Sequence, residues 1–279
     1  MNSIKTFDDM YRRVADSGRR ARIAAVRPDD EATQAALDQI ATQGLADIIR
    51  IDDPVPEQAA QQAVELIRHG DADVLMKGLI GTDVVLRAVL NKEYGLLPEG
   101  RVLTHLAAAE IPSYHKMLLF TDAAVIPYPT HQQRLEQVRY AVDVCHRMGM
   151  AEPRVALIHC AEHGGKQFPF VDEYPDIKQR AAKGEFGPCI VDGPLDVKSA
   201  CSLQALRTKG IDSPLQGESD VLVLPDIEAG NAFYKTLGIF ANSRTAGMLC
   251  GTTAPVVVPS RGDDSEAKYN SILFALASL

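Results

Sequence analysis

Short apolar runs alternate with longer amphipathic runs along almost the whole chain, and this alternation constrains the fold more than any other feature. Near the start, the apolar run RIAAV begins at Arg22, a helical pattern covers about residues 30–43, and ADIIRI begins at Ala46. Short apolar runs bounded by turn residues are typical of buried strands. The order strand, helix, strand predicts an α/β fold with a mainly parallel sheet.

Length and charge narrow the class of protein. With 279 residues the chain is long enough for two α/β domains. A net charge of -8 argues against nucleic-acid binding, which needs a basic face, but a local group of Arg and Lys side chains is enough to bind a small anion. We therefore expect a ligand pocket, no nucleic-acid partner and no membrane partner.

Cysteine content and hydropathy indicate the compartment. The five cysteines are scattered without the close pairs of a zinc site or a disulfide framework, so we expect reduced thiols. The first residues carry acids and a helical apolar period at Phe7, Met10 and Val14, unlike a secretory signal. No apolar run reaches the roughly 18 residues that span a bilayer. These features predict a cytoplasmic protein.

Small or ionic residues follow several predicted strands. In an open α/β sheet, ligands bind outside the carboxyl ends of the strands, where loops and helix N-termini converge. The pattern predicts a polar cleft at that edge, although each pair taken singly is equally explained by turns and caps. The pairs are Lys77-Gly78, Thr121-Asp122, Asp192-Gly193, Pro225-Asp226 and Ser260-Arg261.

The segment 256–266, VVVPSRGDDSE, combines a strand end with a helix start. If the helix begins at about Asp264 or Ser265, its first turn offers unpaired N–H groups beside the Arg261 guanidinium and the Ser260 hydroxyl, which suits a phosphate. In the alternative, Asp263, Asp264 and Ser265 merely cap the helix and Arg261 pairs with one of them.

Two other segments carry cations. In residues 225–235, Gly230 allows a close backbone approach, Asn231 caps a helix or binds a ligand, and Lys235 follows one turn later. An ordinary helix entry with a solvated lysine is about as consistent with this spacing. In residues 75–90, Lys77 ends a strand and Arg87 follows within the next helix, either near the sheet edge or on a solvated face.

Several familiar motifs are absent. No GxGxxG follows the first strand, and no phosphate-binding P-loop or GxSxG occurs. His159, Cys160 and His163 lie close in sequence, but no fourth ligand accompanies them, so we expect no metal site.

Five ordered segments stand out together: ADVLMKGLIGTD, IPSYHKMLLFTDAAV, CIVDGPLDVKSA, SDVLVLPDIEAGNAFYK and VVVPSRGDDSEAKYNSILFAL. They resemble the phosphate acetyl/butyryltransferase family, and its butyryl branch more than its acetyl branch. The resemblance runs from about Asp71 to the C-terminus, while the first 70 residues match in pattern only.

The resemblance implies the reaction acyl-CoA plus phosphate to acyl phosphate plus CoA, with a short acyl chain (butyryl, branched or propionyl) and direct attack in a ternary complex. CoA and phosphate would be substrates, with no permanently bound cofactor. It also implies a two-lobed fold similar to isocitrate and isopropylmalate dehydrogenases, with the active site in the interdomain cleft. One domain would comprise residues 1–96 and 247–279, and the other residues 97–246. A homodimer or a higher homo-oligomer is expected by analogy.

The family's motifs place functional roles on particular residues. Its Ser-Arg pair falls on Ser260 and Arg261, and the arginine of its Thr-x-x-x-x-Arg helix falls on Arg87. Arg261 and Arg87 would bind phosphate or the CoA phosphates, and Ser260 would donate to the reacting phosphate or the tetrahedral intermediate. The expected substrate-binding residues are Arg87, Lys77, Gly78, Thr82, Asp192, Gly193, Gly230, Asn231 and Lys235.

The identity of the general base is open. In the reverse direction a carboxylate would take the proton from the CoA thiol, but the family's acid aligns with Ala267. Asp263, Asp264 and Glu266 are the nearby candidates. Because of this departure, a non-catalytic sensor that binds acyl-CoA or phosphate is an alternative function. An acetyl-specific phosphate acetyltransferase is another. A metal- and nicotinamide-dependent dehydrogenase is the weakest alternative, because no clustered aspartates accompany the pattern.

Overall fold

The computed structural model describes residues 4–279. The chain forms two compact units. Unit 1 is Thr104–Ser243 with the described residues before Thr6, and unit 2 is Thr6–Leu103 with Arg244–Leu279. The expected domains, residues 1–96 with 247–279 and residues 97–246, stay a prediction.

Unit 2 contains five strands in the order β2-β1-β3-β10-β9. All neighbours are parallel except β9, which is antiparallel to β10. The elements in chain order are α1 (Phe7–Asp16), β1 (Ala21–Val26), α2 (Glu31–Thr42), β2 (Ala46–Ile51), α3 (Pro56–Arg68), β3 (Val74–Lys77), α4 (Thr82–Val89), β9 (Arg244–Cys250), β10 (Val256–Val257) and α10 (Ser265–Ala277).

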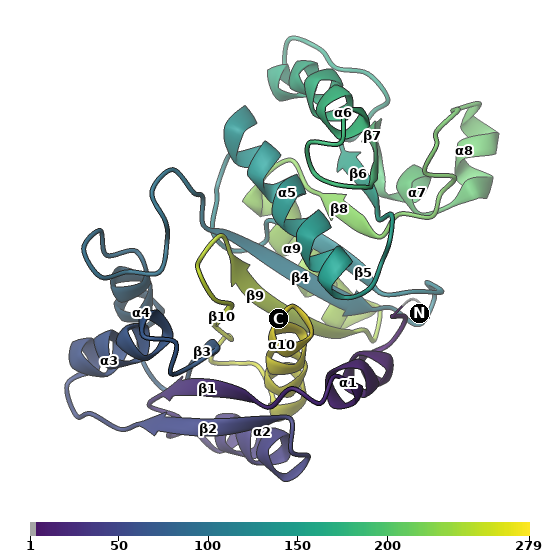
Figure 1. Cartoon of the computed structure of the whole chain (residues 1–279). Coiled ribbons are helices and arrows are strands. Elements are labelled where there is room, and N and C mark those ends of the chain that lie inside the picture. Colours follow the sequence, from purple (N-terminus) through teal and green to yellow (C-terminus); the bar gives the residue numbers. More distant parts are fainter. Residues whose placement is uncertain (1–3) are drawn as a thin grey trace. The chain divides into compact units, whose positions relative to one another are not determined.

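Helices α1, α2 and α10 of unit 2 begin at side-chain caps. Thr6 forms a capping box with Asp9 at the start of α1, and the Asp30 side chain accepts from the backbone N–H of Thr33 at the start of α2. Helix α10 packs against β9, α2 and α1, and Figure 1 shows it beside β9 and β10. Every residue of α10 from Lys268 to Ala277 is buried, which explains its continuous apolar sequence.

Unit 1 contains five strands in the order β4-β5-β8-β6-β7. Strand β4 is antiparallel to β5, and the other neighbours are parallel, so the prediction of mainly parallel strands is confirmed. The elements are β4 (Thr104–Glu110), β5 (Leu118–Thr121), α5 (His131–Arg147), β6 (Arg154–Ile158), the 3₁₀ helix η1 (Pro169–Glu173), α6 (Tyr174–Ala182), β7 (Ile190–Leu195), α7 (Val197–Ala200), α8 (Leu203–Lys209), β8 (Val221–Val223) and α9 (Ile227–Phe240).

Apolar packing fixes the helices of unit 1 on their strands. Phe120 of β5 is fully buried and contacts the rings of Phe233 and Tyr234 edge-on or tilted, which seats α9 on the strands. Helix α5 packs against β5 and β8.

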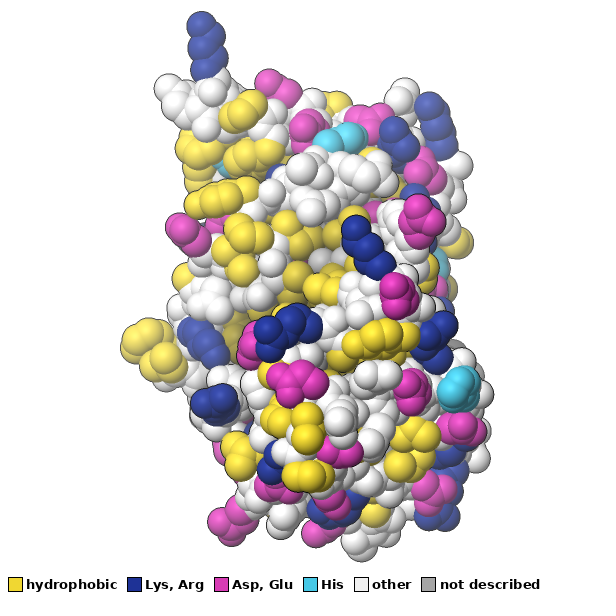
Figure 2. Space-filling view, turned by 90° about the vertical axis from the view of Figure 1, so that its left-hand side faces the viewer, with side chains coloured by type: hydrophobic (Ala, Val, Ile, Leu, Met, Phe, Trp, Pro, Cys, Tyr) yellow, Lys and Arg dark blue, Asp and Glu magenta, His cyan; other side chains and the backbone are white. Residues whose placement is uncertain are grey.

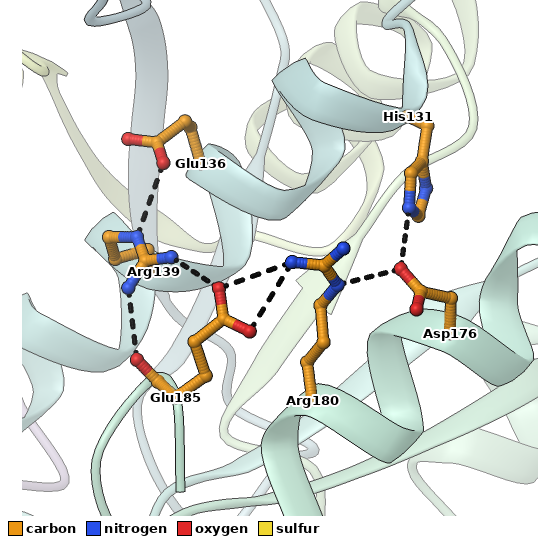
Figure 3. A network of polar contacts seen from close by, with 6 residues as sticks. All are labelled: His131, Glu136, Arg139, Asp176, Arg180 and Glu185. Atoms are coloured by element: carbon orange, nitrogen blue, oxygen red, sulfur yellow. Dashed lines mark hydrogen bonds and ion pairs between the residues drawn. The ribbon is translucent and has the colours of Figure 1, made fainter. Parts of the chain in front are cut away.

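Ion pairs join α5 to α6 and to the turn after it. His131 Nε2 and Arg180 Nε each lie 2.7 Å from Asp176 Oδ2, and Arg139 Nη2 lies 3.0 Å from Glu185 Oε1 (Figure 3). These side chains keep appreciable solvent exposure, so each pair contributes little to stability. The network links α5 with α6 and with the turn after α6.

On the face shown in Figure 2, Lys and Arg side chains are interspersed with Asp and Glu. Among residues 4–279, no helix is both long and apolar enough to cross a membrane. The five cysteines are free thiols.

Candidate active site

Three parallel strands of unit 2 end at one edge and bring distant residues together. The register pairs Val26 with Lys77 and Met76 with Val257, so β1, β3 and β10 finish side by side. The chain continues from β1 toward the start of α2 and from β10 toward the start of α10. Lys77, Arg261 and Lys268 therefore gather here, and we call them the cationic cluster.

Lys77 is a buried lysine without a carboxylate partner. Its side chain ends β3, the residue is 3% exposed, and Nζ donates to the carbonyl of Gly78 at 3.1 Å. Within the described residues it forms no ion pair. Burial lowers its pKa, the charges of Lys268 and Arg261 lower it further, and Asp30 and Asp263 oppose the shift. An anion placed beside Lys77 would relieve this unfavourable environment.

Lys268 lies in a buried ion pair that the sequence interpretation missed. Its Nζ lies 2.6 Å from Asp30 Oδ1 and 3.0 Å from Thr33 Oγ1, and its side chain is 5% exposed. Burial raises the pKa of Asp30, but hydrogen bonds from Lys268 and Thr33 outweigh it and lower the pKa to about 2. The available signal was a lone lysine at the head of the apolar part of α10.

At the start of α10, one of the two expected aspartates caps the helix, and the nearby arginine has no partner in the described part of the chain. Helix α10 begins at Ser265, as expected, and Asp264 Oδ1 accepts from the Ala267 N–H at 2.8 Å. Asp263 Oδ2 accepts from the Ser260 N–H at 2.8 Å. The capping interpretation is thus correct for Asp264, while Arg261 is exposed and forms no hydrogen bond or ion pair with a described residue. That guanidinium remains open to an anion.

The third candidate carboxylate points to a different partner. Glu266 Oε1 lies 2.7 Å from Arg244 Nε in a pair whose side chains are 59% and 34% exposed. Together with the contacts of Asp263 and Asp264, this gives each of the three expected carboxylates a local structural role. None of them is buried in the described structure.

The remaining predicted residues of unit 2 divide into two groups. A Cβ on Gly78 would lie 2.2 Å from the Arg27 carbonyl oxygen, so the strand end requires glycine for a close approach. Thr82 and Arg87 are exposed on α4, and Arg87 Nη2 lies 2.9 Å from Asp83 Oδ2. Arg87 therefore occupies the solvated helix face that was the alternative prediction.

Asp192 and Gly193 of unit 1 serve packing in the described structure. Asp192 is 8% exposed, its Oδ1 lies 2.5 Å from Lys178 Nζ, and its Oδ2 accepts from Ser213 Oγ at 2.6 Å. A Cβ on Gly193 would lie 2.4 Å from the Leu157 carbonyl oxygen. Both positions are explained without a ligand.

The segment before and within α9 differs from its predicted capping. The helix begins at Ile227 with the Asp226 side chain as its cap. Asn231 lies inside the helix, so its predicted capping role is wrong, and its Nδ2 donates to the Ala123 carbonyl at 3.1 Å. Lys235 is exposed, with Nζ 5.2 Å from the centroid of the Tyr234 ring.

Substitution of Gly230 tests whether α9 needs a glycine where it approaches the backbone of Asp122. A Cβ there would lie 1.9 Å from the Asp122 carbonyl oxygen, so Gly230→Ala should lower the free energy of unfolding by about 2–3 kcal/mol. The matched control is Gly238→Ala in the same helix, where no atom lies within 4 Å, and helix propensity should raise the free energy of unfolding by up to about 1 kcal/mol. Urea unfolding measures both, and equal effects of the two changes would contradict the packing role.

The histidines of the loop after β6 have a structural explanation. His159 is 4% exposed and packs edge-on against Phe168 and Phe170, and burial, then the charge of His163, lowers its pKa. Its ring nitrogens lie 3.8 and 3.9 Å from Cys160 Sγ. Within residues 4–279, no group of three or more His, Cys, Asp or Glu is placed to hold a metal ion.

Comparison with known proteins gives the site its context. The chain matches the family model "Phosphate acetyl/butaryl transferase" over residues 50–276. It is 34% identical to a phosphate butyryltransferase of Clostridium acetobutylicum, over 99% of this chain and 98% of that protein. It is 35% identical to a phosphate acetyltransferase of Thermotoga maritima, over 80% of this chain and 76% of that protein.

A solved structure supports the same assignment. A branched-chain phosphotransacylase from Enterococcus faecalis has a TM-score of 0.81 with 28% sequence identity, covering 92% of this chain and 98% of that chain. This likeness confirms the predicted α/β fold class, and the family match confirms the resemblance found in the sequence motifs. The chain belongs to the phosphate acetyl/butyryl transferase family.

Proposed function

We propose that this protein transfers a short-chain acyl group between CoA and inorganic phosphate, so that acyl-CoA and phosphate become acyl phosphate and CoA. Beside family membership, one observation carries the proposal. At the end of β3 and the start of α10, Lys77 is buried without a carboxylate partner and Arg261 is exposed without one. The open Arg261 guanidinium suits a dianionic nucleophile, and Lys77 places a second cationic group at the same strand edge.

The reaction needs little from the protein beyond positioning and charge stabilisation. Phosphate binds to Arg261 and to the positive end of α10, which holds it for direct attack on the thioester carbonyl in a ternary complex. The Ser260 hydroxyl donates to the oxyanion that develops on the carbonyl oxygen or to the reacting phosphate. No covalent enzyme intermediate is required.

The proposed acyl chain is butyryl, propionyl or a branched short chain. The support is that a phosphate butyryltransferase matches over 99% of this chain, and that the branched-chain phosphotransacylase structure is 28% identical to it, against 20% and 18% for two phosphotransacetylase structures. Because a phosphate acetyltransferase is equally similar over a shorter region, an acetyl-specific enzyme is the competing form of this proposal. A methylene group is worth only about 1–3 kcal/mol of discrimination, so substrate rank is decided by measurement.

Release of the CoA thiol tests the function directly. We expect free thiol to appear when the protein is mixed with butyryl-CoA and phosphate, and not when phosphate is omitted, because phosphate is the nucleophile. A chromogenic thiol reagent follows the reaction with acetyl-, propionyl-, butyryl- and isobutyryl-CoA, with EDTA present to remove free divalent ions. Thiol release at the same rate with and without phosphate indicates a hydrolase. Binding of CoA without thiol release from any acyl-CoA supports a sensor.

We further propose that the protein is a cytoplasmic homodimer whose two copies cover exposed apolar residues near the end of α9. Ile239 and Phe240 there are neighbours in the chain and are 71% and 81% exposed, and contiguous exposed apolar surface often marks a protein–protein interface. Light scattering should give twice the 30.3 kDa of the chain. A monomeric mass at micromolar concentration would exclude the dimer.

A further inference from the structure

The proposed reaction leaves one proton without an assigned carrier. When the carbon–sulfur bond breaks, the CoA sulfur departs as a thiolate, which a nearby acid would stabilise by protonation. The carboxylates beside α10 are exposed or partly exposed, and they are engaged with the Ser260 N–H, with the Ala267 N–H and with Arg244. A different titratable group at the same strand edge is therefore the better candidate for the acid.

Lys77 is that group. It lies at the carboxyl end of β3, one residue after Met76, which pairs with Val257 at the end of β10 that leads to Ser260 and Arg261. Only the Gly78 carbonyl accepts a hydrogen bond from Nζ among the described residues, so two of its three ammonium protons have no partner there. A buried ammonium with unused donors beside an anion site is placed to give a proton to a reacting atom.

We propose that Lys77 is the acid that protonates the leaving sulfur of CoA, an inference that rests on the proposed function. An oxygen of the phosphate dianion forms a bond to the carbonyl carbon, the carbon–sulfur bond breaks, and its electron pair goes to sulfur. A proton passes from Lys77 Nζ to sulfur, which leaves a neutral amine. The acyl phosphate, formed with one phosphate proton, then returns that proton to the amine. In the reverse direction the neutral amine takes the thiol proton.

The groups around Lys77 suit this role. Lys268 of α10 and Arg261 of the preceding loop place positive charge near it, and Asp30 at the start of α2 and Asp263 place negative charge near it. Burial and the two cations dominate, so the pKa of Lys77 lies below the ordinary 10.5. The ion pair with Asp30 holds the Lys268 side chain in place, and the charge of Lys268 lowers the proton affinity of Lys77, so Lys268 acts as a positioning residue.

Lys77→Met is the first test. Methionine has a similar length and no charge, so the thermal midpoint should equal or exceed that of the unchanged protein, because no unpaired ammonium is then buried. In the acyl phosphate-forming direction, kcat should fall by about 100-fold or more while the KM for phosphate stays close to its original value. A KM increase with unchanged kcat would assign Lys77 to phosphate binding and overturn the proposal. Lys183→Met, at an exposed position after α6, is the matched control.

The pH profile gives a second readout. Because the acid must be protonated, kcat of the unchanged protein in this direction should fall as pH rises through the pKa of Lys77, below 10.5. Lys77→Met should lack this fall. The same fall in both proteins would mean that another group carries the proton.

Rescue by small amines separates proton transfer from charge alone. Lys77→Ala leaves room for an alkylammonium ion, and ethylamine should restore part of the lost rate. 2-Fluoroethylammonium is of similar size to ethylammonium but more acidic. At a pH where both amines are protonated, it should restore a higher rate than ethylammonium if proton transfer occurs in the rate-limiting step. Equal rescue by the two amines, or none, would overturn the acid role.

The failure of this inference is distinct from the failure of the proposed function. If the unchanged protein releases no thiol from any acyl-CoA in the presence of phosphate, the function is wrong and Lys77 has no leaving group to protonate. If the unchanged protein is active and Lys77→Met retains its kcat, the function stands and the inference falls.

Discussion

Arg261→Ala should reduce kcat/KM for phosphate by about 10²–10³-fold, because the change removes an unpaired guanidinium from the place where the nucleophile is proposed to bind. Arg261 is exposed and has no hydrogen bond or ion pair within residues 4–279, so its loss should leave the thermal midpoint nearly unchanged. Thiol release at varied phosphate concentration gives kcat and KM separately, and circular dichroism on heating gives the midpoint.

Arg12→Ala is the control for removing an arginine from the same unit. Arg12 lies on α1, is 70% exposed and pairs with Asp9 at 3.1 Å, away from the strand ends that form the cationic cluster. Its kcat/KM should match that of the unchanged protein. Comparable activity of Arg261→Ala and Arg12→Ala would remove Arg261 from the site.

Asp30→Asn should lower the free energy of unfolding by about 3 kcal/mol, because it leaves the buried Lys268 ammonium without a charge partner. The value is placed at the low end for buried pairs because the Asp30 side chain is 27% exposed. Asparagine keeps the shape of the side chain and its ability to cap α2, so the change removes the charge and the hydrogen bond that Oδ2 accepts from Thr33 Oγ1. Urea unfolding at neutral pH measures the effect.

Two comparisons make this result specific. Asp47→Asn breaks the exposed pair with Arg20, whose side chains are 55% and 61% exposed, and should change stability by less than about 1 kcal/mol. Adding Lys268→Met to Asp30→Asn should recover much of the loss, because no unpaired ammonium is then buried. If Asp30→Asn is as mild as Asp47→Asn, the pair contributes nothing beyond a surface contact.

Acid adds an independent check on the same pair. The pKa of Asp30 is lowered from 3.8 to about 2, so the carboxylate stabilises the folded state above pH 3.8 and loses that contribution as pH falls through 2. The contribution amounts to about 2 kcal/mol at most. The stability difference between the unchanged protein and Asp30→Asn should therefore shrink between these two pH values, and a difference that stays constant would contradict the lowered pKa.

Local patterns predicted local structure well. Alternating apolar runs predicted the strands and helices, and the Asp-Asp-Ser run before the last helix predicted its start at Ser265 with a capping aspartate. Both depend on residues within a few positions of one another. The same reasoning failed for Asn231, because Asp226 offers an equally good cap five residues earlier and the helix begins there.

Local sequence patterns could not predict contacts between side chains that are far apart in the sequence. The Lys268 to Asp30 pair joins residues separated by 238 positions, and no periodicity relates them. Arg87 could face either solvent or the strand edge at the same helical spacing, and only the structure assigns it to Asp83. The close contacts at Gly78 and Gly230 likewise depend on which backbone segments meet.

The composition of unit 2 from two separate stretches has a consequence for synthesis on the ribosome. Residues 6–103 emerge first, but β9, β10 and α10 follow only after all of unit 1 has been made. Until then the growing chain exposes the β3 edge that β10 will pair with and the faces of α1 and α2 that α10 will cover. Unit 1 can complete its own fold in that interval, whereas unit 2 waits with unprotected apolar surface. We therefore expect the nascent chain to depend on holding chaperones until α10 arrives, and the cationic cluster to be among the last features to form.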